Sequence, residues 1–228
     1  MSITCFLPCR SGSERVKNKN IRPFAGFNKG LIEIKLKQLE QVDLIDKIIL
    51  STNDVEIITF AKTLNIEKLV IHEREESLCS SQTSTDEIIN MVGNLITEGH
   101  VLWTHVTSPF INGELYTKIL DSYLTGLEEG YDSLMTTSEI RSFVWDESGP
   151  INYDRHVEKW PRTQTLPILH EINSGAFVTS VDTYREMQDR IGKNVKYYPL
   201  SKIEGHDIDW PEDFIIAESL LQAKLGSI

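Results

Sequence analysis

The chain has 228 residues, of which 40% are hydrophobic and 25% charged, and its net charge at pH 7 is −11. These fractions are ordinary for a globular protein with one sizeable core. The negative charge disfavours general binding to nucleic acid or to an anionic membrane, because both are negatively charged themselves. No apolar run approaches the ~18 residues of a membrane span. No secretory signal opens the sequence, so the cytoplasm is the expected compartment.

The three cysteines, Cys5, Cys9 and Cys79, are odd in number and contain no C-x-x-C pair. This usage predicts no disulfide framework. Cys5 and Cys9 are four residues apart across the end of an expected strand, but no further Cys or His pair completes a zinc site. We therefore expect Cys5 to be a packing residue.

An apolar strand followed by a basic loop begins the chain, with the strand at Ile3 to Pro8. The first 37 residues carry eight Lys or Arg and two acidic residues, although the whole chain is acidic. Free backbone N–H groups after such a strand bind phosphate in open α/β sheets. The loop therefore predicts a phosphate site without a P-loop motif, and a solvated basic turn is the alternative. Its candidate residues are Arg10, Ser11, Gly12, Ser13, Arg15, Lys17 and Lys19.

Helical and strand patterns alternate after this loop, which predicts a single α/β domain over residues 1–228. The fold class is Rossmann-like, with a mostly parallel sheet, helices on both faces and right-handed crossovers. Helices are expected near 31–39, 55–64, 86–96, 114–124, 182–188 and from 211 onward. Strands are expected at 47–51, 68–71, 101–105, 133–137, 175–180 and 195–199.

The alternation stops between residues 138 and 173, where aromatic, Pro and charged residues are frequent. This pattern predicts a small inserted segment of hairpins or long loops. An irregular cover over the site is one interpretation. A subunit contact is the other, because exposed Trp and Tyr are enriched at interfaces. We favour both together.

Two carboxylates near the C-terminus, Asp207 and Asp209, predict a metal site. In an extended segment both point to one face about 7 Å apart. A cation between them relieves their repulsion, and Mg²⁺ commonly uses one or two carboxylates together with substrate phosphates. The alternative is that Asp209 ends a strand just before a helix that Pro211 begins.

Two hydroxyl-rich segments are weaker signals. Thr107 and Ser108 follow an expected strand and precede Pro109, which places them at the carboxyl edge of the sheet. Residues 77–86 contain six Ser or Thr, and Ser84 or Thr85 is expected to cap the following helix. The remaining hydroxyls could contact a base or a sugar.

Over nearly its whole length the sequence resembles the acylneuraminate cytidylyltransferases, the CMP-sialic acid synthetase family. The opening loop is similar to the P-x-R-x-G-S-[KR]-…-K-N motif, with Arg10 and the pair Lys19-Asn20 at matching spacing. Segments 50–54, 78–85, 107–109, 161–167 and 173–177 resemble further family motifs, and 207–209 reproduces a metal-binding D-I-D. The sequence departs from the family pattern at Glu14, His105, Val106, Ile111 and Ser174.

The resemblance implies a nucleotide-diphospho-sugar transferase fold, an enzyme that couples CTP to an acidic nine-carbon sugar with release of pyrophosphate, a Mg²⁺ cofactor and a homodimer. The nucleotide site it implies contains Pro8, Arg10, Ser11, Gly12, Ser13, Arg15, Lys19, Asn20, Ser80 and Thr107. The implied acceptor contacts are His105, Ser108, Arg162, Gln164 and Asn173. Arg10, Lys19 and Asp209 are the expected catalytic residues, and Asp207 and Asp209 the metal ligands.

Two alternatives stay open. A related nucleotidyltransferase could use another acidic sugar or a sugar phosphate, as the departures at His105, Val106 and Ile111 allow. A non-catalytic nucleotide-binding protein of the same fold would bind nucleotide without releasing pyrophosphate.

Overall fold

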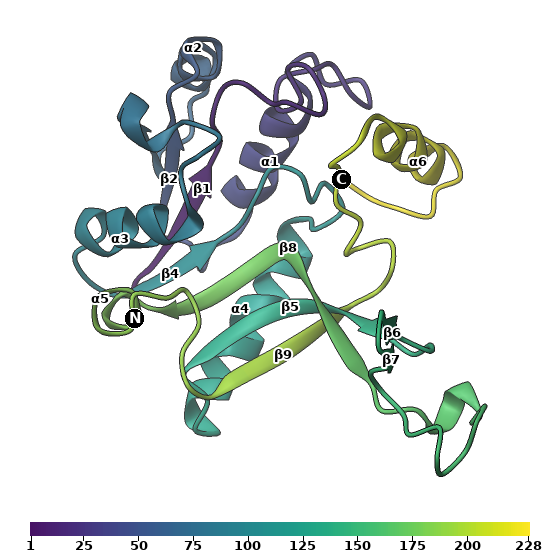
Figure 1. Ribbon diagram of the computed structural model, residues 1–228. Coiled ribbons are helices and arrows are strands. Elements are labelled where there is room, and N and C mark those ends of the chain that lie inside the picture. Colours follow the sequence, from purple (N-terminus) through teal and green to yellow (C-terminus); the bar gives the residue numbers. More distant parts are fainter.

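Seven strands form the central sheet of the computed structural model, which describes residues 1–228 (Figure 1). Their order is β3-β2-β1-β4-β8-β5-β9, and every neighbouring pair is parallel except those that β8 makes with β4 and β5. The predicted mostly parallel sheet is therefore confirmed. The strands are β1 (Ile3–Pro8), β2 (Lys47–Thr52), β3 (Leu69–Glu73), β4 (His100–Trp103), β5 (Ser133–Ile140), β8 (Leu169–Ser180) and β9 (Val195–Leu200).

Helices cover both faces of the sheet because successive strand residues point to opposite sides. In β1, Cys5 and Leu7 pack into one hydrophobic cluster and Phe6 into the other. Residues of α1, α2, α4 and α6 belong to the first cluster, and residues of α3 and α5 to the second. The helices are α1 (Gly30–Glu40), α2 (Val55–Thr63), α3 (Thr85–Leu95), α4 (Gly113–Glu128), α5 (Val181–Glu186) and α6 (Pro211–Gln222).

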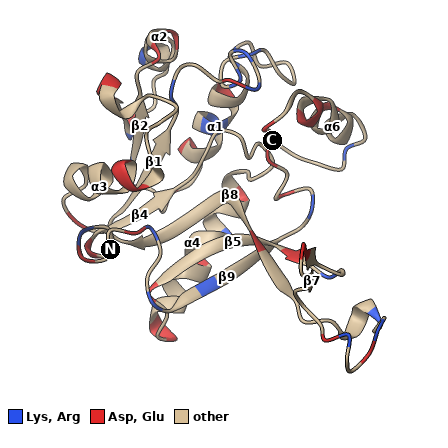
Figure 2. Cartoon of the chain, in the orientation of Figure 1, with Lys and Arg blue, Asp and Glu red and all other residues tan.

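The negative charge of the chain is distributed over the molecule. Figure 2 shows Asp and Glu residues on helices of both faces of the sheet, among them α2, α3 and α6. The excess of Lys and Arg in the first 37 residues is therefore a local feature of an otherwise acidic protein.

The inserted segment is narrower than the sequence predicts. β5 continues to Ile140 and β8 already begins at Leu169, because these two residues pair at the end of a long antiparallel ladder. Residues 141–168, called the arm below, contain the hairpin strands β6 (Trp145–Asp146) and β7 (Gly149–Pro150) and the short 3-10 helix η2 (Thr163–Thr165). Figure 1 shows the arm extending away from the sheet and its helices.

Capping interactions at the N-termini of α3 and α6 hold the segments that precede these helices near the carboxyl edge of the sheet. Ser84 caps α3 in a reciprocal capping box with Glu87, which confirms the predicted cap. Pro211 occupies the first turn of α6, also as predicted. The Asp213 carboxylate accepts hydrogen bonds from the backbone N–H groups of Asp209 and Trp210, at 2.8 and 2.7 Å. The segment that carries the two predicted metal ligands is therefore anchored to α6.

None of the helices combines the length and the apolar character needed to cross a bilayer.

Candidate active site

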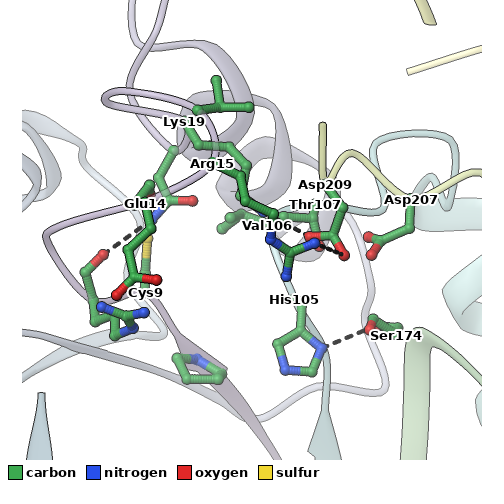
Figure 3. Close-up of a pocket in the computed structure, with 15 residues that line it drawn as sticks. Cys9, Glu14, Arg15, Lys19, His105, Val106, Thr107, Ser174, Asp207 and Asp209 are labelled. Carbon is green, nitrogen blue, oxygen red and sulfur yellow. Dashed lines mark hydrogen bonds and ion pairs between the residues drawn. The ribbon is translucent and has the colours of Figure 1, made fainter. Parts of the chain in front are cut away.

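A cleft of about 310 Å³ lies where β1 and β4 end (Figure 3). Four separate parts of the chain form it: the end of β1 with its basic loop, the segment that follows β4, Ser174 on β8, and the segment that leads to α6. It is called the cleft below. Its lining residues are Pro8, Cys9, Arg10, Ser13, Glu14, Arg15, Val16, Lys19, Asn20, His105, Val106, Thr107, Ser174, Asp207 and Asp209.

The basic loop is tied to its neighbours by its backbone. The Ser11 N–H donates to the Asn53 side chain at 2.9 Å, and the Asn20 side chain donates to the Arg10 carbonyl at 3.2 Å. The Arg10 guanidinium donates to the Gly12 carbonyl at 3.2 Å. Gly12 has a φ of +73°, a left-handed conformation that glycine adopts readily. The loop therefore has a defined shape that holds Arg10 at the cleft.

Asp209 forms ion pairs with two cations of the loop, Lys19 and Arg15. Its carboxylate lies 2.9 Å from Lys19 Nζ and 3.0 Å from the Arg15 guanidinium. Lys19 also donates to the Ile208 carbonyl at 3.0 Å. Partial burial acts to raise the pKa of Asp209, but the hydrogen bond and charge of Lys19, with the charge of Arg15, outweigh it and hold this pKa below its ordinary value. Asp209 is thus ionised at neutral pH.

Asp207 has the opposite environment. Between the two aspartates, Ile208 is fully buried and its N–H donates to the Thr107 carbonyl at 2.8 Å, so both carboxylates face the cleft. Although the segment is not a regular strand, this geometry agrees with the expected shared face. Burial raises the pKa of Asp207, and its buried Oδ1 accepts no hydrogen bond. A buried carboxylate oxygen without a hydrogen-bond partner is suited to be a ligand of a cation.

The donor set suits one particular kind of ion. No group of three or more His, Cys, Asp or Glu side chains is arranged to hold a metal ion by itself. Two aspartates alone match a hard cation that completes its shell with water and substrate oxygens, as Mg²⁺ does. Burial raises the pKa of the Cys5 and Cys9 thiols to about 12, so both are protonated at neutral pH.

His105 forms a wall of the cleft with both ring nitrogens engaged. Nε2 accepts a hydrogen bond from the Trp103 indole at 3.0 Å, which leaves Nδ1 to donate to the Ser174 carbonyl at 3.1 Å. Burial lowers the pKa of His105 to about 4, so the ring is neutral. Only the ring carbons of His105 are available to a ligand. The predicted contact with the acceptor would therefore be a van der Waals contact without a hydrogen bond.

A second pocket, of about 240 Å³, adjoins the cleft and shares Pro8, Arg10 and His105 with it. Its remaining lining residues include part of the hydroxyl-rich segment and two arginines that were not among the predicted site residues. Arg74 directly follows β3, and this position at the carboxyl edge could have indicated it. Arg190 lies between α5 and β9, where no sequence pattern marks it. The remaining residues are Arg74, Leu78, Ser80, Thr83, Ser84, Thr85, Ile88, Trp103 and Arg190.

Most of the predicted site residues come together at these two pockets. The cleft and the second pocket are lined by Pro8, Arg10, Ser13, Arg15, Lys19, Asn20, Ser80, His105, Thr107, Asp207 and Asp209. The residues that line neither are Ser11, Gly12, Lys17, Ser108, Arg162, Gln164 and Asn173, of which Lys17 is exposed to solvent.

Each exception has a structural reason. Ser108 is buried, and its carbonyl accepts a hydrogen bond from Lys35. Asn173 bonds to Thr136 and Ser138 within the β5–β8 ladder. Arg162 and Gln164 lie on the arm, outside the pockets of their own chain. Ser11 and Gly12 contribute backbone groups to the shape of the loop: the Ser11 N–H donates to Asn53, and the Gly12 carbonyl accepts from Arg10.

The sheet, the basic loop and the paired aspartates define a nucleotide-handling α/β protein. The family model described as cytidylyltransferase matches residues 4–225, and the chain belongs to this family.

Two solved structures share the fold over almost the whole chain. CMP:2-keto-3-deoxy-manno-octonic acid synthetase complexed with CTP has a TM-score of 0.68 and 13% identity, covering 98% of this chain and 100% of that one. The 4-diphosphocytidyl-2C-methyl-D-erythritol synthase of Anaerococcus prevotii has a TM-score of 0.66 and 17% identity, covering 97% and 98%. The nucleotide-diphospho-sugar transferase fold implied by the resemblance agrees with both.

Two curated relatives, each 24% identical in the matched region, are cytidylyltransferases named for nonulosonic acids. Pseudaminic acid cytidylyltransferase of Campylobacter jejuni is 24% identical over 129 residues, which cover 54% of each chain. N-acylneuraminate cytidylyltransferase of Escherichia coli is 24% identical over 230 residues, 97% of this chain and 52% of the relative. In these matches the chain spans about half the length of the curated relatives.

Proposed function

We propose that the protein transfers CMP from CTP to an acidic sugar of the nonulosonic class and releases pyrophosphate. The observation that carries this proposal is the cleft itself, where a cationic loop faces two carboxylates, one of them with an orphaned oxygen. Membership of the cytidylyltransferase family and the names of the relatives support the choice of nucleotide and of acceptor class.

In the proposed reaction the anomeric hydroxyl oxygen of the sugar attacks the α-phosphorus of CTP in line. The new bond joins this oxygen to phosphorus, the bond to the β-phosphate oxygen breaks, and the hydroxyl proton passes to solvent. Positioning and charge neutralisation dominate such chemistry. No side chain in the cleft is assigned as the base.

The cations of the loop have distinct parts in this scheme. Arg10 and Lys19 neutralise the triphosphate, and Lys19 also fixes the Asp209 carboxylate through their ion pair. Arg15 is about half exposed and pairs with the same carboxylate, so it can turn from Asp209 to a phosphate when nucleotide enters. Ser13 and Asn20 line the same wall and offer hydrogen bonds to phosphate or ribose oxygens.

We propose Mg²⁺ as the ion that Asp207 and Asp209 hold, together with phosphate oxygens of CTP. When bound, it supplies charge neutralisation at the α-phosphate and the leaving pyrophosphate. The second pocket is our candidate for the nucleobase, because the Ser80 and Thr83 hydroxyls and Arg74 offer hydrogen bonds to base edges.

We also propose a homodimer that forms through the arm. The arm exposes several large apolar side chains, with Val157 84% and Trp160 63% exposed. Exposed aromatic and aliphatic groups on one projecting segment are typical of a contact surface. In such a dimer, Arg162 and Gln164 on the arm of one copy could approach an acceptor bound in the cleft of the other copy.

The test is pyrophosphate release with a panel of nucleotides and acceptors. The nucleotides are CTP, UTP, ATP and GTP, and the acceptors are N-acetylneuraminic, legionaminic and pseudaminic acids and 2-keto-3-deoxy-manno-octonic acid. We expect release with CTP and with at least one nonulosonic acid. A sugar 1-phosphate is added to the panel as an acceptor of the other class. Release only with another nucleotide, or only with this sugar phosphate, would replace this function by the related nucleotidyltransferase. Saturable CTP binding without release would favour the non-catalytic alternative.

A further inference from the structure

Arg190 lies in the second pocket on a platform of two buried rings. Its guanidinium carbon is 3.8 Å from the centre of the Phe177 ring and 5.1 Å from that of Trp103. Phe177 on β8 and Trp103 on β4 are paired in register and each is only 3% exposed. Stacking on aromatic faces holds a guanidinium plane while its N–H edges stay available.

The Arg190 guanidinium makes no hydrogen bond or ion pair within the chain, unlike the other arginines nearby. Arg74 donates twice to Ser51, and Arg10 donates to the carbonyls of its own loop. The adjacent Asp189 carboxylate instead accepts from the backbone N–H of Arg190. A half-buried cation without a partner is costly, so this group is suited to an anion that arrives with the substrates.

The second pocket has a cationic excess that a nucleobase does not explain. Arg10, Arg74 and Arg190 line it, and no Asp or Glu does. Arg74 is fixed to β2 through Ser51, whereas Arg190 lies over β4 and β8. β1 lies between β2 and β4 in the sheet, so the two guanidinium groups are anchored on opposite sides of β1. If Arg74 binds the nucleobase, Arg190 is therefore available to bind a different part of the substrates.

The position of Arg190 points to the acceptor. Trp103, on which it stacks, donates to His105, and His105 lines both the second pocket and the cleft. Arg190 therefore lies one residue away from His105, which belongs to the wall that the two pockets share. The carboxylate of an α-keto acid sugar is the anion that the proposed reaction brings to this place.

We propose that Arg190 binds the carboxylate of the acceptor sugar and so selects acidic acceptors. This inference rests on the proposed function and deepens it. A guanidinium can pair with both carboxylate oxygens, so the fork geometry, and not charge alone, is part of the recognition. Arg162, the arginine that the resemblance implies for the acceptor, lies on the arm of its own chain.

The experiment compares steady-state kinetics of the full chain and the variants Arg190→Met, Arg190→Lys and Arg162→Met. The acceptor is the panel member with the highest wild-type turnover, used as the free acid and as its carboxamide. We expect Arg190→Met to raise the KM for the acid about 10- to 100-fold and to leave the KM for CTP within about twofold. Arg190→Lys keeps the charge without the fork and should fall between wild type and Arg190→Met.

The carboxamide separates recognition from a structural role. Wild type should discriminate strongly between acid and carboxamide, whereas Arg190→Met should treat them alike. Lys193→Met, which removes an exposed positive charge three residues away, is the matched control and should behave as wild type. Circular dichroism melting shows whether each variant is folded.

Four results would overturn the inference. An unchanged KM for the acid in a folded Arg190→Met, or a rise confined to CTP, would remove Arg190 from acceptor binding. Loss of acid discrimination in Arg162→Met alone would assign the role to the arm. If wild type turns over no acceptor in the panel, the proposed function fails first, and the inference falls with it.

Discussion

At the scale of single residues, the two aspartates of the cleft differ although only one residue separates them. Asp209 is held ionised by Lys19 and Arg15, whereas Asp207 is more deeply buried and has an oxygen without a partner. Lys19 and Arg15 already compensate the charge of Asp209, whereas burial raises the pKa of Asp207 and its Oδ1 has no partner. In the proposed function this pair would hold a cation together with substrate phosphates, which would contribute the remaining ligands.

The first prediction concerns Asp209→Asn. This change removes the negative charge that pairs with Lys19 and Arg15, and one of two expected Mg²⁺ ligands. We expect turnover to fall by at least about 100-fold, while the melting temperature changes little, because partly exposed ion pairs stabilise proteins weakly. Pyrophosphate release and thermal melting measure the two effects. Glu212→Gln, an exposed neighbour on α6 outside the cleft, is the control. Near-normal turnover of Asp209→Asn in Mg²⁺ would contradict the assigned role.

Lys35 is a fully buried cation that holds the segment after Thr107. Its Nζ donates to the Ser108 carbonyl at 2.8 Å, the Ile111 carbonyl at 3.3 Å and the Tyr116 hydroxyl at 2.8 Å. Burial lowers the pKa of Lys35 from 10.5 to about 7. Between these two pH values the unfolded chain keeps a proton that the folded chain has released. The free energy of unfolding therefore gains a contribution that rises with pH in this window.

This contribution gives a second prediction. Lys35→Met, which has a similar length and no titrating group, should lack the rise. The unfolding free energy of wild type relative to the variant should increase from pH 7 to pH 10 by an amount on the order of a few kcal/mol. Urea denaturation at several pH values measures this increase. Cys5 and Cys9 are present in both proteins, so the comparison with the variant largely cancels the contribution of their titration. Parallel pH profiles would show that Lys35 stays charged in the folded protein.

The sequence indicates some site residues well and others poorly. Asp207, Asp209 and Lys19 could be predicted because they lie in short motifs next to strand and helix signals. Arg190 could not, since its place depends on Phe177 and Trp103, which belong to two different strands. The neutral state of His105 likewise depends on Trp103 and Ser174, and no local pattern encodes these partners.

At the scale of elements, the loop after β1 shows how a backbone shape supports the site. Gly12 lies outside the lining of the cleft, yet its carbonyl accepts a hydrogen bond from Arg10. A Cβ at Gly12 would meet only the Arg10 guanidinium, at 3.9 Å, so space does not require glycine. The φ of +73° does require it, because other residues are strained in this region.

The third prediction is that Gly12→Ala costs about 1 kcal/mol of stability and raises the KM for CTP several-fold, because the loop shifts Arg10. Gly26→Ala is a matched control. Gly26 has a φ of +84°, a Cβ there would meet nothing within 4 Å, and the residue does not line the cleft. It should lose similar stability while the KM for CTP stays the same. Equal KM values for the two variants would show that the shape of the Gly12 loop is not needed for nucleotide binding.

Most elements could be predicted because their apolar periodicity is local. α1, α2 and α3 begin and end within two residues of the expected positions. The direction of β8 could not be predicted, since a strand carries the same pattern whether its neighbours are parallel or antiparallel. Its length was also missed, because residues 169–174 pair with β5 beyond the buried part of the sheet and lack an apolar pattern.

At the scale of the whole molecule, the arm extends away from the sheet and its helices and is not packed against them. Its aromatic cluster is self-contained, with Trp145 and Trp160 stacked at 6.3 Å and Phe143 edge-on to Trp160 at 5.6 Å. Arg155 lies over both Trp rings. The cluster keeps the arm in shape while its outer side chains remain exposed.

The fourth prediction tests the dimer through that exposed side. Val157→Glu should shift the protein from dimer to monomer, because it buries a charge in the proposed interface without touching the aromatic cluster. Val55→Glu, a similarly exposed position at the start of α2, should leave the dimer intact. Light scattering during size-exclusion chromatography gives the masses. A wild-type monomer, or a dimer unaffected by Val157→Glu, would remove the arm as the interface.

Transfer of CMP at the two aspartates is best tested by the product formed from CTP, Mg²⁺ and a nonulosonic acid. Wild type and Asp207→Asn are compared beside a control without acceptor, and mass spectrometry identifies the nucleotide products. We expect a CMP-sugar and an equal amount of pyrophosphate from wild type, neither without acceptor, and at most traces from the variant. Absence of a CMP-sugar with every acid, or an undiminished yield from Asp207→Asn, would show that the cleft does not perform this transfer as proposed.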